Sequence, residues 1–188
     1  MKVLIKESKW AGKFLNFFHY YLDNGKIYEV CSRKRFPDPS HCDAVDIIAF
    51  NEDYTQVCIV KEHRVPIEGP IYSFPAGLRE ADEEILETAT RELFEETGLK
   101  LIRVVKILPP SFQSPGMSDE NVATVICIAT GELTNSNATS DEEIEPMWVS
   151  MKEAPMLLEG NFSLSARCQI FLSMWSGYIY HSSWRKEP

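Results

Sequence analysis

Long apolar runs and a basic excess are both missing from this 188-residue chain. The longest apolar stretches, such as Val122 to Ala129, are about half the length of a membrane-spanning helix, so we expect no membrane span. The first residues, Met1 to Glu7, lack the apolar region of a secretory signal, and we expect a cytoplasmic protein. The net charge of −9 argues against nucleic acid as a partner, because nonspecific binding depends on basic residues that neutralise phosphates.

Cysteine and histidine are sparse and dispersed. The five cysteines are odd in number and include no pair at two-residue spacing, which indicates reduced thiols in strands or core. The four histidines are equally scattered, so a zinc cluster has little support. A chain of this length can form one domain with a substantial core without disulfides or a structural metal.

What the chain does have is a dense group of carboxylates on a helical pattern. From Glu83 to Thr97, apolar and small residues recur every three or four positions, and Gly98 supplies a C-terminal stop. Glu92, Glu95 and Glu96 share one edge of this helix, where like charges cost roughly 0.2–0.5 kcal/mol per pair. A hard cation would remove the repulsion, and Mg²⁺ fits oxygen ligands best. A solvated acidic face is the alternative interpretation.

The spacing around this helix resembles the signature of the Nudix hydrolases. Gly77 is followed after five residues by Glu83 and, after seven more, by Arg-Glu-Leu-x-Glu-Glu-x-Gly-Leu from Arg91 to Leu99. In that family the carboxylates at two of these positions hold the metals, a third assists, and the carbonyl before the signature glycine also serves. The resemblance therefore implies a metal set of Ala76, Glu92, Glu95 and Glu96 that holds Mg²⁺, with Mn²⁺ as a substitute.

The strand and helix patterns predict an α/β fold. An Asp-Asn-Gly turn joins two strand patterns, 14–22 and 26–35, into a hairpin. Further strands are expected at 44–50, 56–63, 71–74, 101–108, 121–130 and 144–149, with later helices at 152–158 and 163–178. This order predicts a mixed sheet with helices on both faces. The resemblance implies the same Nudix α/β/α sandwich with an additional N-terminal antiparallel sheet.

The same resemblance implies that the chain is divided into two sections. We expect residues 42–188 to form the Nudix hydrolase domain and residues 1–41 to form an N-terminal β-sheet extension. In the nucleoside-diphosphate-sugar branch of the family such a sheet helps to form a dimer. The resemblance therefore implies a homodimer.

A segment rich in Pro, Ser and Gly resembles the substrate loop of enzymes that act on ADP-ribose. Pro115 falls 16 residues after Leu99, where those enzymes characteristically have a proline. The resemblance implies substrate contacts at Pro115, Gly116, Met117 and Glu120. A plain connecting loop would also use proline and glycine.

Other positions match the same relatives more loosely. Arg64 matches an arginine that contacts phosphate, and Leu78 follows the signature glycine and would line the substrate pocket. Tyr28, Glu29 and Arg33 match an aromatic residue, a glutamate and an arginine that bind adenine in some ADP-ribose enzymes, sometimes across the dimer. Alternating strand residues explain the same three letters without a ligand.

The general base is expected on an acidic loop. The segment 140–145 resembles the one that carries this base in ADP-ribose pyrophosphatases, with Glu142 as first choice and Glu143 as second. A solvated acid-rich loop is the alternative. Ser73 departs from the family pattern, since many relatives have Glu at this position, two residues before the Pro-Ala-Gly turn.

These resemblances predict a Mg²⁺-dependent hydrolase that cleaves the pyrophosphate of ADP-ribose or a related nucleoside diphosphate sugar. From ADP-ribose the products would be AMP and ribose 5-phosphate, and the partner is a small nucleotide sugar. Two alternatives stay open. One is a nucleoside-triphosphate pyrophosphohydrolase that removes damaged nucleotides, and the other is a non-catalytic module that senses nucleotide sugars.

Overall fold

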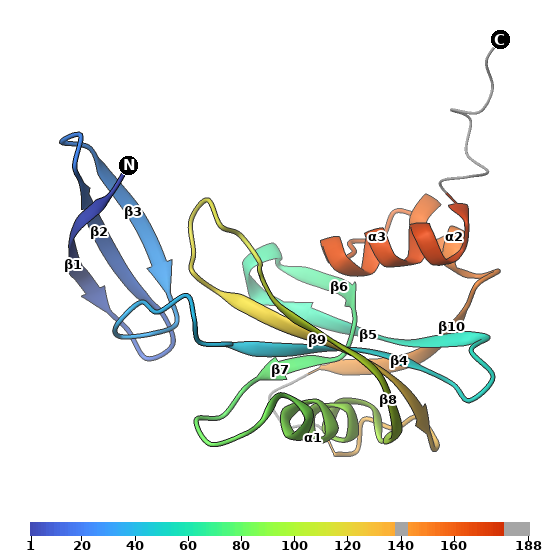
Figure 1. Cartoon of the computed structure of the whole chain (residues 1–188). Helices are drawn as coiled ribbons and strands as arrows, with labels where there is room; N and C mark the ends of the chain where they lie inside the picture. The colour runs from blue at the N-terminus through green and yellow to red at the C-terminus, as the bar shows by residue number, and fades with distance from the viewer. Residues whose placement is uncertain (138–142, 179–188) are drawn as a thin grey trace, which may run out of the picture.

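The computed structural model describes residues 1–137 and 143–178, with the element order shown in Figure 1. The elements are β1 (Val3–Ala11), β2 (Asn16–Leu22), β3 (Ile27–Ser32), β4 (Ala44–Phe50), β5 (Gln56–Arg64), the 3-10 turn η1 (Val65–Ile67), β6 (Gly69–Ser73), β7 (Ala76–Leu78), α1 (Ile85–Thr97), β8 (Lys100–Phe112), β9 (Asn121–Thr130), β10 (Ile144–Ser150), α2 (Ala154–Glu159) and α3 (Ala166–Trp175).

A seven-stranded mixed sheet forms the centre of the molecule. Its main path is β10-β5-β4-β9-β8, with β6 paired to β5 and β7 paired to β4. The strands β4 and β9 are parallel, and the other pairs are antiparallel. In Figure 1, α1 lies on one face of this sheet and α2 and α3 lie on the other. The predicted α/β/α sandwich is confirmed. No helix in the described ranges is both long and apolar enough to span a bilayer.

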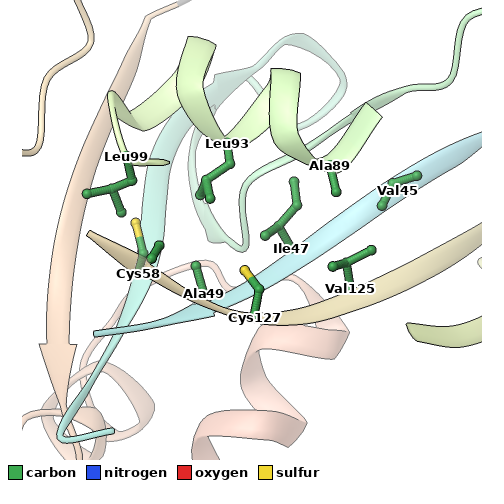
Figure 2. Close-up of a cluster of buried hydrophobic side chains, with 10 residues drawn as sticks. Val45, Ile47, Ala49, Cys58, Ala89, Leu93, Leu99, Val125 and Cys127 are labelled. Carbon is green, nitrogen blue, oxygen red and sulfur yellow. The ribbon is translucent and has the colours of Figure 1, made fainter. Parts of the chain in front are cut away.

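The strand β4 is apolar on both sides because both faces of the sheet are covered. Val45, Ile47 and Ala49 join the cluster beneath α1, shown in Figure 2, whereas Ile48 and Phe50 join the cluster beneath α3. Alternation along the strand assigns successive residues to opposite faces. On α1 itself the buried stripe includes Ala89 and Leu93, which are fully buried. This packing fixes the rotation of α1 and so sets which edge carries its glutamates.

Helix α1 begins two residues later than the sequence pattern predicts. The Glu84 backbone N–H donates to the Glu87 side chain at 2.8 Å, which satisfies one free donor at the start of the helix. At the other end Gly98 adopts φ 73°, and its N–H donates to the Phe94 carbonyl. Glu83 therefore lies just outside the helix, where its side chain is available to other partners.

The N-terminal antiparallel sheet, β1-β2-β3, stands beside the main sheet (Figure 1). The β2–β3 hairpin was predicted, but β1 was not among the expected strands. The Cys31 N–H donates to the Met117 carbonyl at 2.8 Å, and the Asn121 side chain donates to the Pro39 carbonyl at 3.0 Å. The first contact attaches the N-terminal sheet to the segment between β8 and β9, and the second attaches the connector between β3 and β4 to the start of β9.

The strand β8 continues four residues beyond its predicted end at Leu108. It passes through Pro109 and Pro110, which cannot donate to a sheet ladder. The strand tolerates them because it lies at an edge of the sheet and its register shifts between Leu108 and Ser111.

Candidate active site

The signature turn and helix α1 meet at one tightly packed corner. The Ala76 N–H donates to Glu96 Oε2 at 3.1 Å. A Cβ placed on Gly77 would lie 1.8 Å from the carboxyl carbon of Glu92, so only glycine allows this approach. Both acids are thus held against the backbone of strand β7. Glu96 is 6% exposed, although it carries an ionisable group.

Arg91 organises the acidic edge of α1. Its guanidinium donates to Glu83 at 2.7 Å, to Glu92 at 2.6 Å and to Glu95 at 3.2 Å. A further bond at 3.1 Å reaches the carbonyl of Leu78. The hydrogen bonds from Arg91 lower the pKa of Glu83 to about 2, and the bond to Glu83 raises the pKa of Arg91. Arg91 thereby offsets the like-charge repulsion among the glutamates on this edge of α1.

The donor set at this corner fits a hard divalent cation. The carboxylates of Glu92 and Glu96 lie against the backbone at Gly77 and Ala76, and both supply oxygen ligands. Glu95 stands further out, since its side chain is 42% exposed and bonded to Arg91. Within residues 1–137 and 143–178, no three acidic, histidine or cysteine side chains are arranged to hold an ion together. Mg²⁺ suits such a place, because it is commonly held by one or two carboxylates plus substrate phosphates.

A cavity of about 530 Å³ opens in front of these acids. Seven of the residues predicted for the site line it: Arg33, Arg64, Ala76, Leu78, Glu92, Glu96 and Glu120. They come from the N-terminal sheet, from β5, from β7, from α1 and from the loop before β9. The fold thus brings metal-type ligands and basic side chains together, as recognition of a diphosphate requires.

The guanidinium of Arg64 is positioned by its neighbour Glu62. Arg64 Nη2 lies 2.8 Å from Glu62 Oε2, and the Ser73 hydroxyl donates to the other oxygen of Glu62 at 2.8 Å. Glu62 is 9% exposed. The departure at Ser73 from the family pattern therefore places a neutral donor beside a buried carboxylate.

The loop residues that are predicted to contact substrate lie at two different cavities. Pro115 and Met117 line a separate, largely apolar cavity of about 390 Å³ together with Tyr28. The hydroxyl of Tyr28 donates to the Gly116 carbonyl at 2.5 Å. Glu120 instead forms an ion pair with Arg33 at the main cavity.

Within one chain the three predicted adenine contacts lie apart: Tyr28 lines the apolar cavity, Arg33 lines the main cavity, and Glu29 pairs with His19. Neighbouring residues of a strand point to opposite faces, so Tyr28 and Glu29 face opposite sides of β3. Glu29 Oε1 lies 3.6 Å from His19 Nε2 on the facing strand β2. Within one chain, Tyr28, Glu29 and Arg33 therefore do not surround one base.

Of the two candidates for the general base, Glu142 lies outside the described residues. Glu143 is exposed and lines a cavity of about 560 Å³, which also includes Glu62. Because Glu62 lines the main cavity as well, the two cavities adjoin. Glu143 therefore lines a cavity next to the main one and is not among the residues that line the main cavity itself.

Sequence reasoning missed several polar residues of the site. Asp46, Glu62 and Gln113 line the main cavity, and Arg167 forms an ion pair with Asp46 from the start of α3. The sequence could have marked Asp46 as a site residue, because it is the single charged residue of the buried strand β4. Arg167 has no local signal, because 121 positions separate it from Asp46. Burial lowers the pKa of Arg167.

Comparison with known proteins agrees with this geometry. A model of the family described as NUDIX domain matches residues 40–168. The chain is 32% identical over 161 residues to an ADP-ribose pyrophosphatase of Bacillus subtilis, covering 84% of this chain and 83% of the relative. It is 36% identical over 135 residues to an ADP-ribose pyrophosphatase of Saccharomyces cerevisiae, covering 69% of this chain and 55% of the relative.

A solved structure shares the whole fold. A crystal structure of an ADP compounds hydrolase superposes with a TM-score of 0.71 at 20% identity, covering 95% of this chain and 94% of that one. The chain belongs to the NUDIX domain family. It is a Nudix hydrolase similar to the ADP-ribose pyrophosphatases, and the resemblance inferred from the signature is confirmed.

Proposed function

We propose that this protein hydrolyses the pyrophosphate bond of ADP-ribose or a related nucleoside diphosphate sugar, giving AMP and ribose 5-phosphate from ADP-ribose. One observation carries the proposal: the corner where Glu92 and Glu96 meet the Ala76–Gly77 backbone opens onto a cavity that also holds Arg64. Acids for a cation and a guanidinium for phosphate oxygens then face the same space. The similarity to ADP-ribose pyrophosphatases supports this choice of substrate class.

The metal would be Mg²⁺, with Mn²⁺ as a substitute, held by Glu92, Glu96 and the Ala76 carbonyl. Glu95 assists from the outer edge of the group through Arg91. A bound divalent cation supplies charge neutralisation for the diphosphate and lowers the pKa of water. The carboxylates of Glu92 and Glu96 would hold the cation from one side, and the substrate phosphates would supply further oxygen ligands.

The remaining steps fall to side chains of this chain. Arg64, held in place by Glu62, would donate to a phosphate oxygen, and Leu78 would pack against the substrate. Glu142 or Glu143 would accept the proton of the attacking water.

The nucleoside would lie toward the N-terminal sheet. Arg33 and Glu120 line one part of the main cavity, and the separate apolar cavity is lined by Tyr28, Pro115 and Met117, with the Gly116 carbonyl bonded to Tyr28. Aromatic and apolar side chains with few polar groups suit a planar base. Glu29 would contribute only from a second copy of the chain, because it faces away from Tyr28.

We also propose a homodimer formed through residues 1–41. Strand β1 is exposed along its whole length, and Leu4, Ile5 and Trp10 are each 60% exposed. Apolar side chains gathered on an exposed edge strand favour pairing with another chain. Light scattering of the purified protein tests the dimer directly.

The five cysteines are unpaired, which fits the reducing cytoplasm.

A substrate panel tests the proposed reaction. The protein is incubated with Mg²⁺ and ADP-ribose, other nucleoside diphosphate sugars or nucleoside triphosphates, and a phosphatase then releases phosphate from any monoester product. We expect release from ADP-ribose or another nucleotide sugar. Preferential release of pyrophosphate from triphosphates would favour the nucleotide house-cleaning alternative. Tight binding of a nucleotide sugar without any product would favour the sensing module.

A further inference from the structure

A smaller cavity of about 200 Å³ lies beside the main one, and we call it the annex. It is lined at the start of α3 by Ser165, Ala166 and Arg167, and across from them by Asp46, Arg64 and Ser73. Asp46 and Arg64 line both cavities. The annex is therefore a side chamber of the active-site cavity rather than a remote pocket.

The two guanidinium groups of the annex are each matched by a carboxylate. Arg167 forms an ion pair with Asp46, and Arg64 forms one with Glu62. Arg167 also donates to the Ser111 hydroxyl at 3.0 Å. Because both cations already have partners, the annex carries no excess positive charge for an additional phosphate group.

The chemistry of the lining fits a sugar ring. Hydroxyl groups both donate and accept hydrogen bonds, so they suit a wall that mixes guanidinium, carboxylate, amide and hydroxyl groups. The annex supplies all four through Arg167, Asp46, Gln113 and Ser73. Its volume is far below that of a typical site for a whole drug-sized ligand, so it would take one small group.

We propose that the annex binds the terminal sugar of the nucleoside diphosphate sugar and that Arg167 is a specificity-determining residue there. This inference rests on the proposed function. The diphosphate then spans the metal corner at Glu92 and Glu96, with the nucleoside toward Arg33 and the sugar toward α3. An uncharged polyhydroxylated ring is favoured over a terminal group that carries its own phosphate.

Two substrates of equal charge separate sugar recognition from diphosphate cleavage. One is ADP-ribose, and the other is the methyl ester of ADP at its terminal phosphate, which has the same P–O–P linkage but no sugar. Ala166→Leu adds bulk to the annex from the exposed start of α3 and keeps all four residues of the two ion pairs. Ala81→Leu, in the exposed loop before α1, adds the same side chain away from the cavities and is the control.

We expect Ala166→Leu to raise KM for ADP-ribose at least tenfold, while kcat/KM for the methyl ester changes less than twofold. Arg167→Ala should show the same selectivity, and Arg167→Lys should recover part of the loss. Arg103→Ala, at an exposed arginine that bonds Tyr54, is the matched control for charge and should leave both substrates unaffected. Melting temperatures show that each variant is folded.

These measurements distinguish failure of the sugar site from failure of the proposed function. Equal losses on both substrates, or no loss on ADP-ribose, overturn the sugar site and leave the proposed reaction standing. Tighter binding of ADP-ribose that is phosphorylated on its terminal ribose would show an anion site and also overturn it. If the unaltered protein cleaves neither substrate nor any other nucleotide sugar, the proposed function fails and the inference fails with it.

Discussion

The α-carbon of Gly77 lies so close to the carboxylate of Glu92 that no side chain fits between them. A Cβ at position 77 would be 1.9 Å from Glu92 Oε1. This contact joins the β7 turn to the edge of α1 where the acids cluster. The glycine is therefore required by the position of an acid fifteen residues later, since the backbone conformation at Gly77 makes no such demand.

Gly77→Ala tests this close approach. The Glu92 carboxylate is the far end of a flexible side chain, so it would swing away and leave the fold intact. We expect activity to fall about 10- to 100-fold, since changes to the groups that support metal ligands typically cost that much. Steady-state hydrolysis and thermal melting measure the two effects. Gly69→Ala is the control, because its nearest neighbour would be 3.7 Å away. Wild-type activity in Gly77→Ala would contradict the assignment.

The ion pair between Arg33 and Glu120 should couple the N-terminal sheet to substrate binding. We expect Arg33→Ala and Glu120→Ala each to raise KM for the nucleotide sugar, because both side chains line the main cavity. Residues in direct contact give non-additive effects, here about 1 kcal/mol of coupling in a double-mutant cycle. Strictly additive changes in KM would show that the pair does not act as one unit.

The bond between Arg91 and Glu83 should make stability depend on acid pH. Arg91 lowers the pKa of Glu83 from 4.5 to about 2, so the ionised form is favoured in the folded protein. This stabilisation is fully present above pH 4.5 and is lost as pH falls from 4.5 through 2. Glu83→Gln should lower the free energy of unfolding at pH 7 by about 1 kcal/mol.

Urea unfolding of both proteins across this pH range measures the difference. The gap between wild type and Glu83→Gln should be constant at neutral pH and should narrow steadily below pH 4.5. A gap that widens as pH falls has the wrong sign for this ion pair.

Buried thiols should resist alkylation in the native protein. Burial raises the pKa of Cys127 and Cys168 to about 12 and also raises the pKa of Cys58. Since the thiolate is the reactive form, iodoacetamide at pH 8 should modify half-buried Cys31 long before these three. Mass spectrometry of the modified peptides follows each site, and the protein in urea is the control. Equal rates at Cys31 and Cys127 in native protein would contradict the buried assignment.

The sequence predicts those parts of the fold in which local pattern and tertiary packing agree. The strands β4 and β9 match their predicted bounds, and the buried stripe of α1 follows helical spacing. Strand β1 escaped prediction because both of its faces are exposed, so no apolar alternation marks it. The end of β8 escaped because prolines normally exclude a strand, which holds for interior strands and fails at an edge.

The same distinction, between residues marked by a local pattern and residues placed by tertiary packing, holds for the site. The signature predicts Glu92, Glu96 and Ala76, because their spacing on a helix and a turn is a local property. The ion pair of Asp46 with Arg167 depends on how α3 packs against the sheet, which no local pattern encodes. Tyr28 and Glu29 face opposite sides of β3, so the two could serve one adenine only across a dimer.

The most direct test of the account compares Glu96→Gln with the unaltered protein on ADP-ribose and Mg²⁺. Glutamine keeps the size of the side chain but lacks the charge that a divalent cation requires. We expect the unaltered protein to form AMP and ribose 5-phosphate in equal amounts, and Glu96→Gln to melt normally but to have no measurable turnover. Full activity of Glu96→Gln with Mg²⁺ would show that Glu96 does not hold the metal ion needed for hydrolysis.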